Sequence, residues 1–258
     1  FLLPIQCFYF PLYKIVFHFS NFLIPSLVIL SFAFPLRFRI GVARYWGTMN
    51  LFALKYLCNL TYEVKGLDNV GNETVVFAGK HQSTWETLSF TNIFPPFVWV
   101  LKKELLKVPV FGWCLSQLGT IAIDRSQGLK AINQITQEGK VILDQELSIF
   151  VFPEGTRTIA REKGNYGVGG TILAKKNKAK IIPVAHNAGE FWPRSTFLVK
   201  PGVIQVSVGP AIETQGRKLA EVNQEVEDWI ENEMLKINQN FDKQYPEKYT
   251  TPLHQISE

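Results

Sequence analysis

Residues 148–157 read Ser-Ile-Phe-Val-Phe-Pro-Glu-Gly-Thr-Arg, and this stretch decides the fold. Its first half, 148–152, is a short and almost wholly apolar run, which predicts a strand buried on both faces of a sheet. Proline and glycine then end the strand, and the turn that follows carries Glu154 and Arg157. In open α/β sheets, ligands bind beyond the carboxyl ends of the strands. The stretch therefore predicts an interior strand with a polar site at its end.

Strand-like and helix-like segments alternate on both sides of this stretch. The alternation predicts the α/β class, with a mainly parallel sheet flanked by helices. The last long segment, 219–238, has its apolar residues on one helical face. Expected strands cover 74–78, 97–101, 120–123, 148–152, 179–184 and 205–208, and expected helices cover 84–94, 110–118, 130–146, 170–178 and 219–238.

Polar clusters follow four of the expected strands. Because the carboxyl ends of parallel strands share one edge of a sheet, we expect these clusters to lie near one another. Four clusters in one chain are a stronger indication of a site than any one of them. They are His81 after 74–78, Asp124 and Arg125 after 120–123, the turn 153–157 after 148–152, and His186 with Asn187 after 179–184.

The first cluster pairs His81 with Glu86. On one ideal helix these residues point apart, but they can meet if His81 lies in the turn before the helix. Glu86 would then accept the imidazole N–H and leave the other ring nitrogen to take a proton. A structural alternative is equally specific, because Ser83-x-x-Glu86 is a capping box, in which Glu86 serves helix stability alone. The spacing leaves both roles open.

The turn that contains Glu154 and Arg157 also has two interpretations. Arginine grips phosphate oxygens in a bidentate way, so Arg157 is a candidate phosphate clamp, with Arg125 as a second arm. The structural alternative is a tight glycine turn held by an ion pair between Arg157 and Glu154. His186 stands among apolar neighbours and is interpreted as a satisfied core or loop histidine.

Composition and charge exclude several classes of protein. Hydrophobic residues make up 47% of the 258 residues, which excludes a disordered chain. The net charge of +5 comes entirely from residues 1–62, which hold five basic residues and no acidic one. Basic residues in an apolar, Phe-rich segment fit an anionic lipid surface and argue against nucleic-acid binding. The chain has no metal-binding motif, no nucleotide P-loop and no G-x-S-x-G elbow, and its three cysteines indicate no disulfide framework.

The N-terminal segment is apolar enough to enter a membrane. Between Lys14 and Arg37 lie 22 uncharged residues, which as one helix would span roughly 33 Å. Pro25 falls within this run, so the preferred interpretation is two short helices hinged near Pro25 and inserted into one leaflet, with a single spanning helix as the alternative. Arg37, Arg39 and Arg44 would then mark the headgroup level and place the following domain in the cytoplasm. We expect membrane-anchoring helices at 1–60, an α/β domain at 61–241 and a polar tail at 242–258.

Four sequence blocks carry a family resemblance. They are His81-x4-Glu86, Gly119-Thr-Ile-Ala-Ile-Asp-Arg125, Phe152-Pro-Glu-Gly-Thr-Arg157 and Ile181-Ile-Pro-Val184. In this order they resemble the blocks of the glycerolipid acyltransferases, and most closely those of the bacterial 1-acyl-glycerol-3-phosphate acyltransferases (lysophosphatidic acid acyltransferases). The resemblance covers roughly residues 60–210.

The resemblance implies direct acyl transfer from acyl-CoA or acyl-carrier protein to the sn-2 hydroxyl of lysophosphatidic acid, without a cofactor. It makes His81 the general base and Glu86 its partner, with Arg125 and Arg157 on the acceptor phosphate and Lys102 or Lys103 beside them. It assigns Glu154, Gly155 and Thr156 to support of the site, with Glu154 bracing the arginine turn. It also implies a monotopic enzyme on the cytoplasmic face of the bacterial inner membrane, with membrane lipids as partners and an oligomeric state that the sequence leaves open.

Two departures from the family pattern bear on these roles. The acid of the first block is usually Asp, and here it is Glu86, one methylene longer. Members often carry a basic Phe-Lys-x-Gly segment after the third block, whereas residues 166–169 read Tyr-Gly-Val-Gly. The second departure weakens any phosphate role for this loop. Two alternatives stay open: the same chemistry on glycerol 3-phosphate or another lysolipid, and an inactive lipid-binding protein that keeps the fold.

Overall fold

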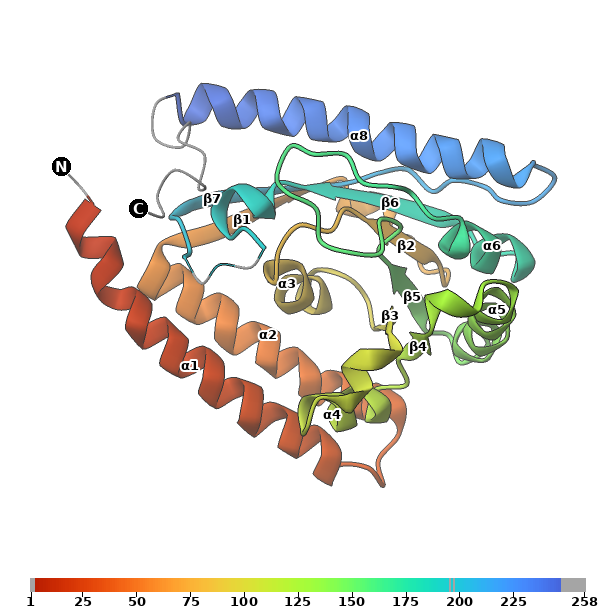
Figure 1. Ribbon diagram of the computed structural model, residues 1–258, viewed down its shortest axis with the longest axis horizontal. Coiled ribbons are helices and arrows are strands. Elements are labelled where there is room, and N and C mark those ends of the chain that lie inside the picture. The colour runs from red at the N-terminus through yellow and green to blue at the C-terminus, as the bar shows by residue number, and fades with distance from the viewer. Residues whose placement is uncertain (1–2, 195, 197, 247–258) are drawn as a thin grey trace.

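A seven-stranded sheet forms the centre of the protein, seen here in a computed structural model (Figure 1). The structure describes residues 3–194, 196 and 198–246, without the side chains of 3–10 and Arg125. The strand order is β1-β7-β6-β2-β5-β3-β4. The strands are β1 (Leu60–Lys65), β2 (Val76–Gly79), β3 (Phe97–Lys102), β4 (Ile121–Ile123), β5 (Ser148–Val151), β6 (Ile181–His186) and β7 (Gly202–Val208).

Five of the six strand pairings are parallel, which confirms the predicted fold class. Only β6 and β7 run antiparallel. The three central strands β6, β2 and β5 are buried along their whole length, as expected for strands covered on both faces. The edge strand β1 was not predicted, because its alternating Leu-Thr-Tyr-Glu-Val-Lys sequence lies at the assumed boundary between anchor and domain.

Helices cover both faces of the sheet. One core, rich in phenylalanine, lies between the sheet and helices α2 and α3, and the other lies between the sheet and helices α5, α6 and α8. The helices after the first strand are α3 (Trp85–Ile93), α4 (Phe111–Gln117), α5 (Leu129–Asp144), α6 (Gly169–Lys176), α7 (Ala188–Phe191) and α8 (Leu219–Gln244), with short 3-10 turns η1 (Leu67–Asn69), η2 (Lys103–Lys107) and η3 (Arg125–Gln127).

The amphipathic C-terminal helix was predicted correctly, with one adjustment at its end. Val222, Val226, Ile230 and Met234 are buried on the predicted face of α8, and Trp229 is half-buried against the same core. The helix continues to Gln244, beyond the predicted end, because Ile237 and Phe241 extend the buried stripe. The rest of the expected tail, residues 247–258, lies outside the described residues.

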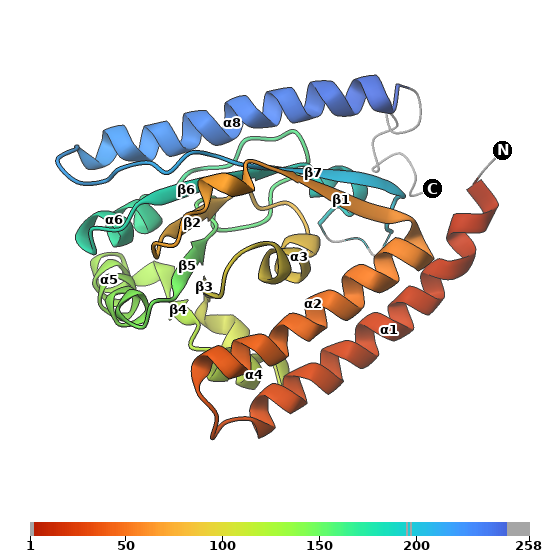
Figure 2. The ribbon, with the colours of Figure 1, turned by 180° about the vertical axis from the view of Figure 1, so that it is seen from behind.

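Two long helices, α1 (Leu3–Leu30) and α2 (Leu36–Cys58), form an antiparallel pair beside the domain (Figure 2). The predicted hinge near Pro25 is wrong, since Pro25 lies inside α1 and the chain turns at 31–35. Proline removes one backbone N–H, but α1 packs along α2, so the helix persists.

The outer surface of this helical pair is apolar. Phenylalanine, leucine and isoleucine side chains on α1 and the following turn are 43–74% exposed, including Phe22, Leu30 and Phe32. Within the described residues, Pro11–Leu30 is long and apolar enough to cross a membrane. All three arginines expected at the headgroup level contact protein groups: Arg39 binds the carbonyl and side chain of Gln117, Arg37 pairs with Glu146, and Arg44 donates to the Asn92 carbonyl. The cysteines with described side chains, Cys58 and Cys114, are buried free thiols.

Candidate active site

His81 and Glu86 meet in the geometry that the sequence left open. The chain leaves β2 at Gly79, turns through His81 and enters α3 at Trp85. In this arrangement His81 Nδ1 lies 3.2 Å from Glu86 Oε2. A carboxylate can only accept, so Nδ1 carries the proton and Nε2 keeps its lone pair. The imidazole stacks on the Phe152 ring with the centroids 3.9 Å apart, and it lines a mainly apolar pocket.

Glu86 makes contacts that fit both predicted roles. Its second oxygen, Oε1, accepts the backbone N–H groups of Gln82 at 2.6 Å and Ser83 at 2.8 Å, which includes the contact expected of the capping box. Burial opposes ionisation of this fully buried carboxyl group, but the contacts with His186 and His81 outweigh it and lower its pKa to about 2. Glu86 is therefore a carboxylate at neutral pH, as an orienting acid must be.

His186 is the satisfied buried histidine that the sequence predicted, but it has an additional partner. Its Nε2 donates to the Lys80 carbonyl at 2.8 Å, and its Nδ1 accepts the Ala188 N–H at 3.2 Å. The same Nε2 lies 3.2 Å from Glu86 Oε1. Sequence reasoning missed this contact, because 100 residues separate the two side chains and only the pairing of β2 with β6 brings them together.

Arg157 faces the same pocket as His81. Its Nη1 donates to Thr84 Oγ1 at 3.1 Å, and Arg194 binds its carbonyl at 2.6 Å. Gly155 and Thr156 from the same turn also line the pocket, and Gly155 has φ 72°, a left-handed conformation that glycine adopts without strain. The structure thus brings the turn after β5 and the turn after β2 to one place, as predicted.

The other predicted phosphate ligands divide into three cases. Lys102, at the end of β3, lines the pocket with His81 and Arg157. Lys103 begins η2 and is exposed, and it is not among the residues described as lining this pocket. Arg125 begins η3 after β4, and its side chain lies outside the described residues.

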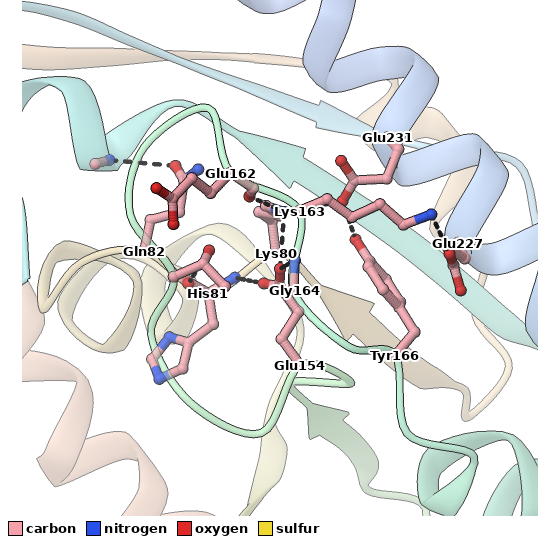
Figure 3. A network of polar contacts seen from close by, with 12 residues as sticks. Lys80, His81, Gln82, Glu154, Glu162, Lys163, Gly164, Tyr166, Glu227 and Glu231 are labelled. Carbon is pink, nitrogen blue, oxygen red and sulfur yellow. Dashed lines mark hydrogen bonds and ion pairs between the residues drawn. The ribbon is translucent and has the colours of Figure 1, made fainter.

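Glu154 does not brace the arginine turn in the predicted way. Its Oε1 accepts hydrogen bonds from Lys80 Nζ at 2.8 Å and from the Gly164 N–H at 3.0 Å, and its Oε2 accepts the His81 N–H at 3.0 Å (Figure 3). Among the described contacts it forms none with Arg157. The carboxylate points into the protein because it forms an ion pair with the buried Lys80. Glu154 therefore supports the turn that contains His81 and not the side chain of Arg157.

The pocket beside His81 has a volume of about 340 Å³. Its polar lining comes from α3 and from the strand ends and turns already described. Its apolar lining comes from β3, from Phe152 after β5 and from helices, including the two N-terminal ones. Such a pocket fits a ligand with a polar head and a long apolar chain. The apolar helical residues are Ile24 and Pro25 from α1, Ala43 and Trp46 from α2, and Phe111, Cys114 and Leu115 from α4, with Leu118 directly after α4.

The chemistry available here is proton transfer next to a cation. Nε2 of His81 faces the pocket with a lone pair, a buried carboxylate stands behind the ring, and Arg157 and Lys102 line the same space. This arrangement can deprotonate a hydroxyl group that belongs to an anionic molecule. Within the described residues, no group of three or more His, Cys, Asp or Glu side chains is placed to hold a metal ion.

Comparisons with known proteins indicate one family. The family model described as Acyltransferase matches residues 61–187, which contain His81, Glu86 and Arg157. A 1-acyl-sn-glycerol-3-phosphate acyltransferase of Pseudomonas aeruginosa is 40% identical over 208 residues, or 80% of each chain. The enzyme of the same name from Saccharomyces cerevisiae is 32% identical over 54% of this chain and 48% of its own.

A solved structure shows the same fold. The 1-acyl-sn-glycerophosphate acyltransferase PlsC of Thermotoga maritima superposes with a TM-score of 0.74 over 90% of this chain and 98% of its own, at 16% identity. On the family match and the relative from Pseudomonas, this chain belongs to the acyltransferase family that includes the 1-acyl-sn-glycerol-3-phosphate acyltransferases.

Proposed function

We propose that this enzyme transfers a fatty acyl group from acyl-CoA or acyl-carrier protein to the sn-2 hydroxyl of 1-acyl-glycerol-3-phosphate, giving phosphatidic acid. One observation carries the proposal: the open nitrogen of His81 faces a pocket that combines cationic side chains with a deep apolar lining. A lysophospholipid presents the matching groups, which are a phosphate, a hydroxyl and an acyl chain. The acceptor named by the relatives is the same lipid.

In this mechanism His81 Nε2 removes the proton of the acceptor hydroxyl as the oxygen attacks the thioester carbonyl. The negative charge of Glu86 stabilises the imidazolium that forms. The tetrahedral intermediate then collapses, the carbon–sulfur bond breaks, and the thiolate leaves and takes the proton back from His81. The products are the ester and a free thiol, so protons and electrons balance without an acyl-enzyme intermediate.

Arg157 and Lys102 hold the acceptor phosphate in this proposal. Both side chains line the pocket beside His81, and Arg157 is oriented by Thr84. The apolar walls from α1, α2 and α4 receive an acyl chain. The exposed apolar surface of α1 and α2 lies in one leaflet of the bacterial inner membrane, with the α/β domain on the cytoplasmic side.

The test is release of free thiol when purified protein is mixed with acyl-CoA and a panel of acceptors. We expect the fastest release with 1-acyl-glycerol-3-phosphate and slower release with a lysolipid that lacks an exposed phosphate monoester. Glycerol 3-phosphate as the best acceptor would replace the proposed substrate, and no release with any acceptor and either donor would favour the lipid-binding alternative.

Arg157→Lys examines the phosphate assignment separately. Lysine keeps the charge but cannot form the bidentate fork, so we expect the KM for 1-acyl-glycerol-3-phosphate to rise about tenfold with little change in kcat. The rise should shrink for an acceptor without a phosphate monoester. An equal loss on both acceptors would show that Arg157 supports the turn and does not bind phosphate.

Protease protection distinguishes the two membrane arrangements. Protease added outside sealed spheroplasts reaches the N-terminal end of a spanning α1, but it reaches no part of a helical pair held in the inner leaflet. We expect the chain to stay intact. Cleavage before residue 14 would establish the spanning arrangement.

A further inference from the structure

Two peptide groups flank His81, and each is held from both sides. In the first, between residues 80 and 81, the Lys80 carbonyl accepts the His186 Nε2–H at 2.8 Å, and the His81 N–H donates to Glu154 Oε2 at 3.0 Å. Side chains therefore form hydrogen bonds with both polar groups of this peptide, its carbonyl and its N–H. Its orientation is fixed by two residues that lie far from it in the sequence.

The second peptide group, between residues 81 and 82, is held in the same way. The His81 carbonyl accepts the Thr158 N–H at 2.8 Å and the Thr158 hydroxyl at 3.1 Å, while the Gln82 N–H donates to Glu86 Oε1 at 2.6 Å. Two fixed peptide planes determine φ and ψ of the residue between them. They therefore determine the direction in which the His81 side chain leaves the backbone.

Four side chains hold these two peptide groups: His186, Glu154, Thr158 and Glu86. Among them, Glu154 is the one that forms an ion pair with a buried lysine. Its side chain is 0% exposed, and the ammonium group that faces it, on Lys80, is 1% exposed. Lys80 Nζ donates to Glu154 Oε1 at 2.8 Å, to Glu231 Oε1 at 2.8 Å and to the Glu162 carbonyl at 3.0 Å, so all three of its N–H groups are used (Figure 3).

The network continues onto α8. Glu231 lies on that helix and also accepts the Tyr166 hydroxyl at 2.6 Å. Figure 3 shows Lys80 and Glu154 between the histidine turn and α8, with the imidazole of His81 on the side away from the lysine. A buried carboxylate without a cation takes up a proton or turns toward water. Either change weakens the hydrogen bond from the His81 N–H, because a neutral carboxyl group is a weaker acceptor than a carboxylate and a displaced one no longer reaches the N–H.

We propose that Lys80 is a positioning residue for acyl transfer: by holding the Glu154 carboxylate against the His81 N–H, it fixes the peptide plane that directs the imidazole toward Glu86 and the pocket. The inference rests on the role of His81 in the proposed function. Lys80 does not line the pocket beside His81, so its effect reaches the reaction through Glu154 and the backbone.

Lys80→Met tests this directly, because methionine keeps the length of the side chain and removes its charge. We expect kcat to fall about 10- to 100-fold, since a displacement of about 1 Å is enough for such a loss, with the KM for each substrate unchanged. The matched control is Lys180→Met. Lys180 also bridges two carboxylates, Glu73 and Glu213. It directly precedes β6, so it lies at the amino end of that strand, opposite the end where His81 lies. Its loss should leave kcat unchanged.

The orientation of the His81 ring can be measured separately from global stability, so it distinguishes a positioning role from a structural one. The chain has four histidines, so nitrogen-15 labelling of histidine gives few ring signals, and His81→Ala identifies the one from His81. In the wild type we expect a single Nδ1–H tautomer, fixed by Glu86. In Lys80→Met we expect a mixture of tautomers, and in Lys180→Met the wild-type signal. A folded Lys80→Met protein with the wild-type signal, or with wild-type kcat, overturns the proposal.

A paired substitution keeps the test valid if Lys80→Met does not fold. Lys80→Met with Glu154→Gln removes one positive and one negative charge and leaves an amide oxygen for the His81 N–H. We expect kcat within about fivefold of wild type and a single tautomer. Glu231→Gln weakens the second ion pair of Lys80, and the Glu231 side chain is partly exposed, so this substitution is tolerated more easily than one at Lys80. We expect it to lower kcat about threefold to tenfold.

Failure of this proposal and failure of the proposed function give different results. The ring signal is measured without substrate, so an ordered wild-type ring that Lys80→Met disorders supports positioning even if acyl transfer is absent. A disordered double variant, or Glu231→Gln with unchanged kcat and ring signal, overturns the role of Lys80 while leaving acyl transfer intact.

Discussion

The turn after β2 and the last residue of β6 make an instructive pair. Both lie at the carboxyl end of a central strand of the sheet, the two strands are neighbours, and each end places a histidine 3.2 Å from an oxygen of Glu86. The environments differ. The side chain of His81 is 17% exposed and keeps one ring nitrogen open to the pocket, whereas His186 is 0% exposed and has both nitrogens bound.

This difference separates a histidine that is able to act as a base from one that is fully engaged in hydrogen bonds. Contact with a carboxylate is common to both residues, so it does not decide the function. The deciding feature is the ring nitrogen that has no protein partner and faces a space large enough for substrate. His81 has such a nitrogen, and His186 uses its ring to hold the backbone beside His81.

The largest predicted effect tests the open nitrogen. His81→Ala should lower kcat by about 10²–10⁴, because a general base of this kind contributes that much, while the melting temperature changes little. Steady-state thiol release and thermal unfolding measure the two quantities. Near-normal turnover in a folded His81→Ala enzyme would remove the distinction between the two histidines.

The next effect concerns the carboxylate that they share. In Glu86→Gln the amide oxygen keeps the two backbone N–H bonds of Oε1, so the amide N–H₂ faces His81 Nδ1. The ring then adopts the opposite tautomer, with its proton on Nε2, and loses its basic nitrogen. We expect kcat to fall about 10²- to 10³-fold with modest loss of stability.

Glu86→Asp separates the reach of this side chain from its charge. Aspartate keeps the charge but is one methylene shorter, so it cannot span both turns, and we expect partial activity. An active and stable Glu86→Gln enzyme would show that Glu86 serves only to cap α3.

A third effect is the dependence of stability on pH. The pKa of Glu86 is lowered from 4.5 to about 2 in the folded chain, so its contribution is fully present above pH 4.5 and is lost as the pH falls toward 2. The contribution amounts to about 3 kcal/mol at neutral pH. Denaturant unfolding across this window should show a steeper loss in the wild type than in Glu86→Gln. Parallel curves would mean that the carboxyl group titrates normally.

The smallest effect on activity belongs to the second histidine. His186→Gln keeps an N–H donor for the Lys80 carbonyl but loses the ring that packs among aromatic side chains. We expect stability to fall by about 1–3 kcal/mol and kcat to stay within about fivefold of wild type. A kcat loss comparable to that of His81→Ala would make His186 a second participant in the reaction.

The sequence predicted those parts of the molecule that depend on local patterns. The apolar runs of β2, β5 and β6 identified the interior of the sheet, since only buried strands are apolar on both faces. Spacing and turn geometry allowed His81 to meet Glu86 but left open whether Glu86 serves catalysis or capping. The position of the site followed from the rule that strand ends gather at one edge of a parallel sheet.

The sequence did not predict contacts that depend on distant partners. Lysine is rarely buried. The sequence near Lys80 does not indicate that it will form ion pairs with Glu154, 74 residues away, and with Glu231, 151 residues away. The wrong prediction of a hinge at Pro25 has the same cause. The local rule that proline breaks helices predicted the hinge, but packing between α1 and α2, which are distant parts of the sequence, maintains the helix.

The apolar lining contributed by Ile24, Pro25, Ala43 and Trp46 has a practical consequence for protein engineering. These residues belong to the two helices that carry the exposed apolar surface, so the same two helices form that surface and one wall of the pocket beside His81. Deleting the helices to gain solubility would open the cavity along its side. A water-soluble form of the enzyme is better sought by replacing outward-facing residues such as Phe22 and Phe32, which leaves both helices and the wall in place.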